Sequence, residues 1–189
     1  ACINYYRADL IPWKKILPIV LLSMPFAFLG GMIQLDGPIY KLLAGITLVI
    51  AALLMIKPVK ENQIPLKNLS MLERSTIGSG IGFISGLIGI GGGIFLSPFL
   101  NILRWQTAKV ISVTASVFIL FNSVAGIAGQ LTNPISINIQ QILTLGLAVA
   151  IGGQIGNYLN IKLLSPRVVK LLTAILVGVV GIRFALTNT

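Results

Sequence analysis

The stretch Ser75–Leu103, STIGSGIGFISGLIGIGGGIFLSPFLNIL, is apolar, carries no charge and is interrupted by three consecutive glycines. A straight helix of this length would rise about 43 Å, well beyond the roughly 30 Å hydrocarbon core of a bilayer. Gly91, Gly92 and Gly93 each disfavour a helix by about 1 kcal/mol relative to alanine, and Pro98 removes a further backbone donor. We therefore predict a helix, an irregular break and a second helix. Broken backbone at membrane depth is tolerated only where protein buries it or where it lines a polar cavity.

The composition of the whole chain indicates an integral membrane protein. Hydrophobic residues make up 56% of the 189 positions and charged residues 10%, a balance that leaves too little polar surface for a water-soluble domain. The net charge of +10 could suggest nucleic acid as a partner. The lysines and arginines lie between apolar runs, however, as membrane-flanking charges do, so we expect a lipid bilayer as the partner and no nucleic acid.

Several enzyme classes are disfavoured by what the sequence contains. It has no histidine and a single cysteine, Cys2, so it offers neither an intrachain disulfide nor a cysteine metal cluster. The acids Asp9, Asp36, Glu61 and Glu73 all fall outside the apolar runs. No intramembrane carboxylate is left for a proton relay, a sodium site or general acid–base chemistry. We expect no enzyme activity, no cofactor and no metal.

The apolar runs predict an all-α, polytopic helical bundle. They cover residues 16–35, 39–56, the broken segment 75–103, 110–131, 141–161 and 171–186. We divide the chain into residues 1–56, a hairpin of two spans; residues 57–74, a polar cytoplasmic linker; and residues 75–189, the broken segment followed by three spans.

An internal repeat relates the first hairpin to the last one. The parallels are IPWKKIL at 11–17 with INIQQIL at 137–143, Gly30 with Gly156, and PIYKLLAGI at 38–46 with PRVVKLLTAI at 166–175, where one residue is inserted. Residues 1–56 then form the second half of a first repeat, and residues 75–189 form a second repeat. We expect the chain to be a C-terminal portion of a two-repeat protein or a shortened member.

The placement of lysine and arginine predicts how the broken segment sits in the membrane. If residues 75–103 cross once, the basic residues divide 8 to 6 between the two sides, which is no bias. If the segment enters and returns to the same side, they divide 12 to 2, a strong positive-inside pattern. We therefore predict a re-entrant segment with Arg74 and Arg104 facing the cytoplasm. This topology also inverts the first hairpin relative to the last, as in many transporters whose broken helices form a midplane site.

The motif GLIGIGGGIFLSPFL at 86–100, followed by Ala-Lys at 108–109 and Thr-Ala-Ser at 114–116, resembles the sulfite exporter TauE/SafE family of membrane transporters. The resemblance extends from about Thr76 to the C-terminus, and members of the family carry two such repeats. It implies export or uptake of sulfite, organosulfonates or related sulfur compounds. It also implies a multi-pass protein of the bacterial inner (cytoplasmic) membrane.

Two groups of glycines invite different interpretations. Gly78, Gly82 and Gly86 recur every four residues, which lets a neighbouring helix approach closely and favours a packing role. Three glycines in a row serve packing poorly and leave backbone N–H groups free. Gly91–Gly93 are therefore candidates for lining a substrate site, with a hinge or a tight turn as the alternative.

A polar stripe follows the helical period along residues 110–131. Its members are Ser112, Ser116, Ser123, Gly126 and Gln130. It either lines a pathway facing the glycine break or makes hydrogen bonds within and between helices. Thr114 and Asn122 are weaker candidates off this line. The predicted substrate-binding residues are Gly91, Gly92, Gly93, Ser112, Ser116, Asn122 and Ser123.

Three further polar residues have a structural alternative beside a functional one. Lys109 fits a topology charge better than a ligand. Gln154 and Asn157 lie in a predicted span and either line the same cavity or make packing hydrogen bonds.

Two hypotheses from different classes remain. The first is a secondary transporter of a small anion, because hydroxyl, amide and glycine N–H groups coordinate oxyanions and the absent carboxylates disfavour a cation site. The second is a non-transporting membrane scaffold or subunit derived from a truncated transporter. Uptake of radiolabelled sulfite by proteoliposomes separates them. The sequence leaves a homo-oligomer open and does not name the anion, the direction of transport or a coupling ion.

Overall fold

The computed structural model describes residues 13–56, 69–133, 139–162 and 166–186. Regular structure within these ranges is entirely helical. The helices are α2 (Trp13–Met32), α3 (Gly37–Ile56), α4 (Met71–Ile88), α5 (Gly93–Ile102), α6 (Ala108–Gln130), α7 (Ile139–Lys162) and α8 (Pro166–Leu186). In the part of the chain that is described, α3, α6, α7 and α8 are long and apolar enough to cross a membrane. The predicted all-α polytopic membrane protein is confirmed.

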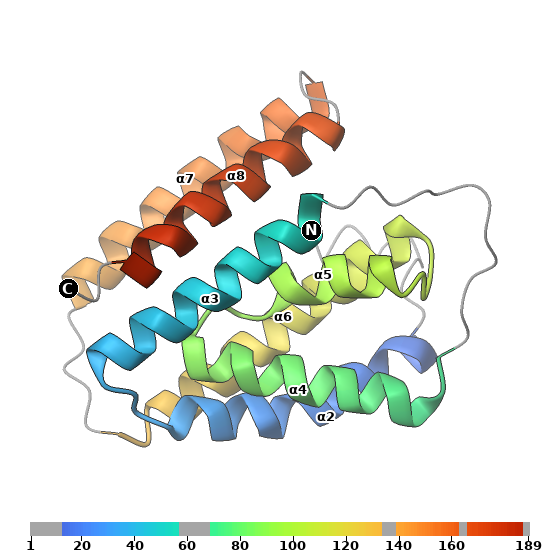
Figure 1. Cartoon of the computed structure of the whole chain (residues 1–189), viewed down its shortest axis with the longest axis horizontal. Helices are drawn as coiled ribbons and strands as arrows, with labels where there is room; N and C mark the ends of the chain where they lie inside the picture. Colours follow the sequence, from blue (N-terminus) through green and yellow to red (C-terminus); the bar gives the residue numbers. More distant parts are fainter. Residues whose placement is uncertain (1–12, 57–68, 134–138, 163–165, 187–189) are drawn as a thin grey trace.

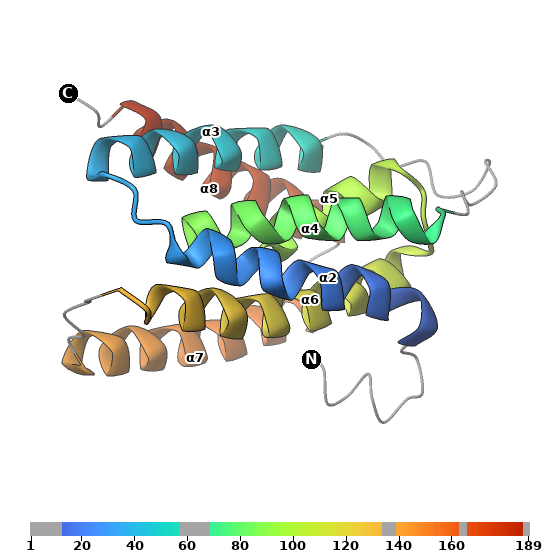
Figure 2. The ribbon, with the colours of Figure 1, turned by 90° about the horizontal axis from the view of Figure 1, so that it is seen from below.

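The helices pack as a bundle in which α2 lies between α4 and α6 (Figures 1 and 2). Helix α3 packs along α8, and α5 contacts both α6 and α3. The main core lies where α2, α5 and α6 meet; its largest members are Trp105, Phe118, Ile16, Ile19, Leu96, Leu100 and Ile111. Large apolar side chains such as Leu53 and Leu176 are exposed on the outside of the bundle, as contact with lipid chains requires.

The seam between α2 and α4 is built on the glycines that recur every four residues. A Cβ placed on Gly82 would lie 2.6 Å from the carbonyl oxygen of Ser23 on α2. Cβ atoms on Gly78 and Gly86 would meet the α2 carbonyls one turn before and one turn after Ser23. On the facing helix, a Cβ on Gly30 would lie 2.8 Å from the backbone nitrogen of Leu87. The packing role predicted for the α4 glycines agrees with these contacts.

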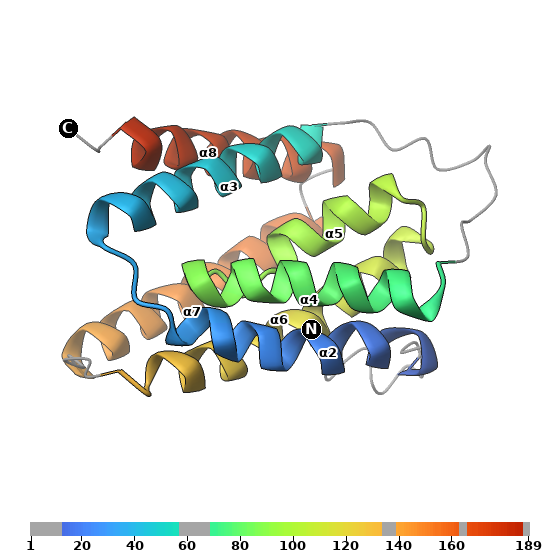
Figure 3. The ribbon, with the colours of Figure 1, turned by 60° about the horizontal axis from the view of Figure 1, so that its bottom comes forward.

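The glycine-rich segment is a helix, a break and a second helix, as predicted. Helix α4 ends at Ile88 and α5 begins at Gly93. The chain then reverses, because α5 starts near the middle of the bundle and runs back toward the end at which α4 begins (Figures 1 and 3). At 10 residues α5 is about 15 Å long, roughly half a bilayer core. The segment therefore has the re-entrant shape that the sequence predicts.

Basic residues gather at the end of the bundle to which the re-entrant segment returns. Arg74 lies in the first turn of α4, Arg104 follows α5, and Lys170 lies in the second turn of α8. Lys41 near the start of α3 and Arg183 near the end of α8 lie at the opposite end. This division of the described residues follows the positive-inside pattern, and the cytoplasmic orientation of the basic end stays a prediction.

The start of α4 corrects the predicted linker at 57–74, because its last four residues, 71–74, are helical. Ser70 caps the helix: its Oγ accepts a hydrogen bond from the N–H of Glu73 at 3.1 Å, and its own N–H donates to Glu73 Oε2 at 2.8 Å. This reciprocal capping box satisfies two backbone donors at once. Residues 57–68 lie outside the described ranges. Helix α8 likewise begins earlier than predicted, at Pro166, since proline is favoured at the first helical position.

The turn from α5 to α6 is closed by a Schellman motif. The N–H of Arg104 donates to the carbonyl of Asn101 at 3.1 Å, and that of Trp105 donates to the carbonyl of Leu100 at 3.2 Å. Arg104 takes the left-handed conformation that such a motif requires, with φ of 52°. Trp105 and Leu100 are both buried, so the hydrophobic contact that accompanies this motif anchors the turn in the core.

The interface between α3 and α8 has two-fold character. A Cβ on Gly181 would lie 3.0 Å from the backbone nitrogen of Val49, and a Cβ on Gly178 would lie 3.5 Å from Cβ of Ala52. In the repeat, where Lys41 aligns with Lys170, Val49 corresponds to Gly178 and Ala52 to Gly181. The contact between Val49 and Gly181 and the contact between Ala52 and Gly178 therefore join equivalent positions of the two repeats, as contacts about a two-fold axis do. Hairpins α2–α3 and α7–α8 run in opposite directions, which is the predicted inverted repeat (Figure 1).

Candidate functional site

The break begins where α4 ends in a left-handed cap. The N–H groups of Gly89 and Ile90 both donate to the carbonyl of Ser85, at 2.8 and 3.3 Å. The hydroxyl of Tyr40, near the start of α3, donates to the carbonyl of Ile88 at 2.9 Å. These bonds satisfy carbonyls that the end of a helix leaves without partners, and they tie α3 to the break.

The start of α5 presents free backbone donors on the other side of the break. The carbonyl of Gly92 accepts from the N–H groups of Phe95 and Leu96 at 3.1 and 3.0 Å and so opens the helix. In the described part of the chain, no hydrogen bond is donated by the N–H groups of Gly91, Gly92 or Ile94. Because a helix N-terminus also carries about half a unit of positive charge, these donors form a site suited to an anion.

Two serine hydroxyls and an aromatic ring surround the glycines of the break. A Cβ on Gly91 would lie 3.0 Å from Oγ of Ser123 on α6. A Cβ on Gly92 would lie 2.9 Å from Oγ of Ser85 on α4 and 2.8 Å from the ring of Phe118. Both glycines are buried and have φ near +70°, which L-residues with a side chain rarely adopt. Shape and backbone conformation thus both require glycine at these two positions.

Only part of the predicted polar stripe lies next to the break. On α6 the atoms nearest to Gly91–Gly93 belong to Ala115, Phe118, Ile119 and Ser123. Ser112 is exposed, and the half-buried Ser116 donates its hydroxyl to the carbonyl of Ser112 at 3.0 Å. At the far end of the stripe, Nε2 of Gln130 lies 3.4 Å from the position of a Cβ on Gly89. Ser123 and Gln130 therefore border the break, whereas Ser116 makes the within-helix bond that was the alternative.

Asn122 lies off the stripe and is almost completely buried. Its side chain is 1% exposed, and its Nδ2 donates to Ser23 Oγ at 2.7 Å and to the carbonyl of Phe118 at 2.9 Å. Ser23 in turn donates to the carbonyl of Val20 at 2.8 Å. Oδ1 of Asn122 is buried with no partner. The pair links α2 to α6 one residue before Ser123, whereas Thr114 bonds the carbonyl four residues earlier in its own helix.

Of the three remaining candidates, Gln154, Lys109 and Asn157, the structure describes the side chain of Gln154 alone. Gln154 is exposed on α7, so it does not line a shared cavity with the glycines. Lys109 lies in the first turn of α6, and its side chain, like that of Asn157, lies outside what the structure describes. No three His, Cys, Asp or Glu side chains come together within the described ranges as a metal site needs.

Sequence reasoning missed Ser85, Tyr40 and Ser23. Ser85 and Ser23 were visible as polar residues inside apolar runs, and each sits where a glycine of the facing segment leaves room for it. The bond from Tyr40 joins residues 48 positions apart, and no local pattern indicates it.

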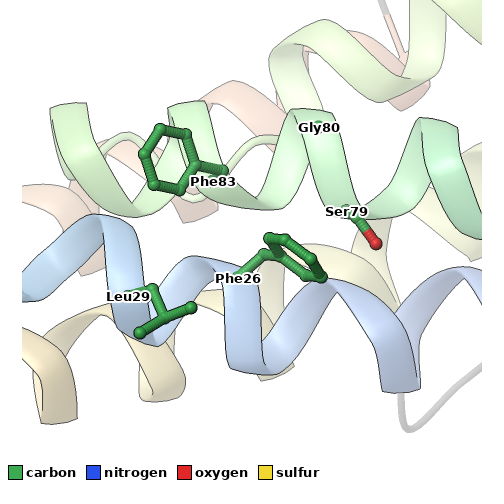
Figure 4. Close-up of a pocket in the computed structure, with 5 residues that line it drawn as sticks. All are labelled: Phe26, Leu29, Ser79, Gly80 and Phe83. Atoms are coloured by element: carbon green, nitrogen blue, oxygen red, sulfur yellow. The ribbon is translucent and has the colours of Figure 1, made fainter.

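A groove on the outer surface differs in character from the break. It has a volume of about 370 Å³ and lies between α2 and α4 (Figure 4). Its lining residues are Phe26, Leu29, Ser79, Gly80 and Phe83. Because its walls are almost entirely apolar and partly exposed, the groove suits a lipid chain and not a charged solute.

Comparison with known proteins places these features in a family. Residues 1–184 match a family described as Sulfite exporter TauE/SafE. The probable membrane transporter protein y4hK of Sinorhizobium fredii is 29% identical over 185 residues, which cover 95% of this chain and 74% of that protein. The probable membrane transporter protein MJ0441 of Methanocaldococcus jannaschii is 27% identical over 183 residues, covering 91% of this chain and 68% of that protein. No solved structure matches the chain.

Proposed function

Because the chain belongs to the sulfite exporter TauE/SafE family, we propose that it is a membrane transporter of small oxyanions and that sulfite or an organosulfonate binds at the glycine break. The names of the two relatives, both probable membrane transporters, support the transport class. The observation that carries the substrate class is the set of unpartnered N–H groups of Gly91, Gly92 and Ile94 at the start of α5. The bacterial cytoplasmic membrane is the proposed location.

The N–H groups of Gly91, Gly92 and Ile94 would bind the oxyanion directly. Each oxygen of a sulfite or sulfonate group accepts hydrogen bonds, and bonds to an ionised acceptor are roughly twice as strong as neutral ones. The positive end of the α5 dipole adds an attraction that acts within the first turn. Neutral donors of this kind bind an anion without a buried lysine or arginine, so the anion can be released on either side.

Hydroxyl groups complete the proposed site. Ser123 from α6 and Ser85 from α4 lie against the two glycines, and both can donate to an oxygen that the backbone does not reach. Asn122, Ser112 and Ser116 belong to the predicted set at a greater distance. Of these, Asn122 acts by fixing α2 against α6 beside Ser123. Ser112 and Ser116 would serve the path along α6 toward the basic end of the bundle.

The alternative, a non-transporting scaffold or subunit, makes an opposite prediction for flux. Protein purified from its own cells is reconstituted in liposomes, and movement of radiolabelled sulfite and sulfoacetate is measured. Flux above protein-free liposomes that is lost in Gly92→Val, but kept in Gly80→Val, is the expected result. The matched control is suitable because nothing lies within 4 Å of a Cβ on Gly80. Folded protein that moves neither solute would favour the scaffold.

A further inference from the structure

Helices α3 and α8 form a tightly packed pair that meets the rest of the bundle at the glycine break (Figure 3). A Cβ on Gly45 would lie 2.6 Å from the backbone nitrogen of Ala185, and a Cβ on Gly181 would lie 2.9 Å from Cβ of Leu48. We refer to this pair of helices as the arm. Outside the arm's own interface, the main contacts of its described residues are those of α3 with α5 and with the end of α4.

The contact between the arm and the break consists of one hydrogen bond and a small apolar cluster. Tyr40, in the first turn of α3, donates its hydroxyl to the carbonyl of Ile88 at 2.9 Å. The cluster joins residues of the arm to residues on both sides of the glycines; its members are Leu48, Ala52, Val177, Ile90 and Ile94. The arm therefore touches the chain immediately before and immediately after the run of three glycines.

Two helix ends of opposite polarity meet at the break. The end of α4 carries about half a unit of negative charge on its carbonyl groups, and the start of α5 carries about half a unit of positive charge on its N–H groups. An anion beside the N–H groups of Gly91, Gly92 and Ile94 is attracted by α5 and repelled by the end of α4. The hydroxyl of Tyr40 offsets part of this repulsion, because its hydrogen points at the carbonyl of Ile88.

The hydroxyl of Ser85 is a second feature of the break that points to a ligand. The residue is 2% exposed, and its Oγ lies 2.9 Å from the position of a Cβ on Gly92. Within the described ranges this hydroxyl makes no hydrogen bond. A buried hydroxyl without a partner is costly, so its position beside the free N–H groups favours a site that binds a hydrogen-bonding solute.

We propose that Tyr40 is a positioning residue of this site, which couples anion binding to the position of the arm. The inference rests on the proposed oxyanion site at the break. The Tyr40 bond and the bound anion stabilise the same arrangement of arm and break, so each strengthens the other. Without the anion the arm takes up further positions, because Gly89, Gly91 and Gly92, all with positive φ, permit large changes in backbone angles.

Tyr40→Phe tests the first half of the proposal, because it keeps the ring and removes the donor. Initial rates of sulfite flux are measured in liposomes over a range of concentrations. We expect the KM to rise roughly 2- to 12-fold, the effect of one hydrogen bond, and the maximal rate to be kept. The matched control is Thr173→Val, which removes an arm hydroxyl that donates to the carbonyl of Val169 within α8 at 2.8 Å. A lower maximal rate at unchanged KM would overturn the proposal, since a purely structural role predicts that result.

Distances between spin labels test the coupling without measuring flux. Labels carried by non-natural amino acids are placed at exposed positions of the protein made by its own cells. The pair Val124 on α6 and Leu176 on α8 crosses the break. The pair Leu53 and Leu176 lies within the arm, and the pair Leu72 and Val124 lies within the rest of the bundle. Sulfite should change the first distance and leave the other two unchanged, and chloride at equal ionic strength should change none.

The same labels connect the movement of the arm to Tyr40. In Tyr40→Phe the sulfite concentration that gives half of the distance change should rise by the same factor as the KM, and in Thr173→Val it should stay unchanged. An equal concentration in Tyr40→Phe and the unmodified protein, or no distance change at all, would overturn the coupling. A distance change in protein that moves no sulfite would contradict the proposed transport and leave the coupling in place.

Discussion

The segment from α4 to α5 carries two groups of glycines that do opposite things. Gly78, Gly82 and Gly86 remain helical and allow α2 to approach until the backbones touch. Gly91 and Gly92, only a few residues later, have positive φ and end helical structure. The difference shows that spacing decides the role: one glycine per turn makes a seam, whereas adjacent glycines make a break that leaves donors free.

The largest expected effect comes from adding a side chain at the seam between α2 and α4. Gly86→Val places a branched side chain against the carbonyl of Ala27, where backbone lies on both sides and cannot yield. Overpacking of this kind costs about 1–3 kcal/mol and occasionally more. We expect loss of monodisperse protein in detergent, or a thermal midpoint lowered by many degrees. If Gly86→Val were as stable as Gly80→Val, the seam would not hold α2 and α4 together.

The break should respond in transport more than in folding. Gly92→Ala adds a Cβ that meets Ser85 and Phe118, in a left-handed conformation that costs an L-residue about 1–2 kcal/mol. We expect protein that still inserts and purifies, with a moderately lower thermal midpoint and little oxyanion flux. Flux is compared with Gly80→Ala at equal reconstituted amounts. Unchanged flux in folded Gly92→Ala would separate the break from the substrate site.

A hydroxyl bordering the break should tune affinity without affecting the seam. Ser123→Ala removes one donor beside Gly91 and leaves the packing of α2 on α4 intact. One hydrogen bond contributes about 0.5–1.5 kcal/mol, so we expect the apparent KM for sulfite to rise roughly 2- to 12-fold. Ser79→Ala is the control, because Ser79 lines the outer groove between α2 and α4 and lies away from the break. Equal shifts in the two variants would remove Ser123 from the site.

The smallest expected effect comes from placing glycine at a position where a non-glycine residue has positive φ. Arg104 is the described non-glycine residue with positive φ, so Arg104→Gly relieves backbone strain that glycine does not have. We expect stabilisation of up to about 1 kcal/mol, offset in part by the greater freedom of glycine in the unfolded chain. A rise of a few degrees in the thermal midpoint is the measurement. A fall would indicate that the arginine side chain contributes more than its strain costs.

The sequence predicted features that depend on neighbouring residues or on the number of basic residues on each side of the membrane. Three adjacent glycines predicted the break, and the distribution of basic residues predicted the re-entrant shape that α5 confirms. The helix start at Met71 was predictable from the Ser-x-x-Glu pattern at Ser70–Glu73, but the charged residues around it were interpreted as a linker. Charges in the first turn of a helix and charges in a loop look alike unless the cap is recognised.

The candidate site was harder to predict because it depends on contacts between helices. Periodicity places Ser112 and Ser123 on one line, yet only Ser123 lies beside Gly91. The other α6 residues nearest to Gly91–Gly93 are Ala115, Phe118 and Ile119, which carry apolar side chains. Asn122 was ranked low for being off that line. It nevertheless points to α2, a neighbour that no pattern within α6 reveals.

The paired contacts between α3 and α8 have a consequence for how the protein can vary. In a dimer of identical chains, one substitution at a two-fold interface appears twice, so its effect on stability is doubled. Here the two sides are separate positions of one gene, and each can change alone. The two sides of this interface already differ. Val49 and Ala52 on α3 carry side chains, whereas their counterparts on α8 are Gly178 and Gly181. A duplicated fold thus keeps the geometry of a symmetric dimer while its two halves specialise independently.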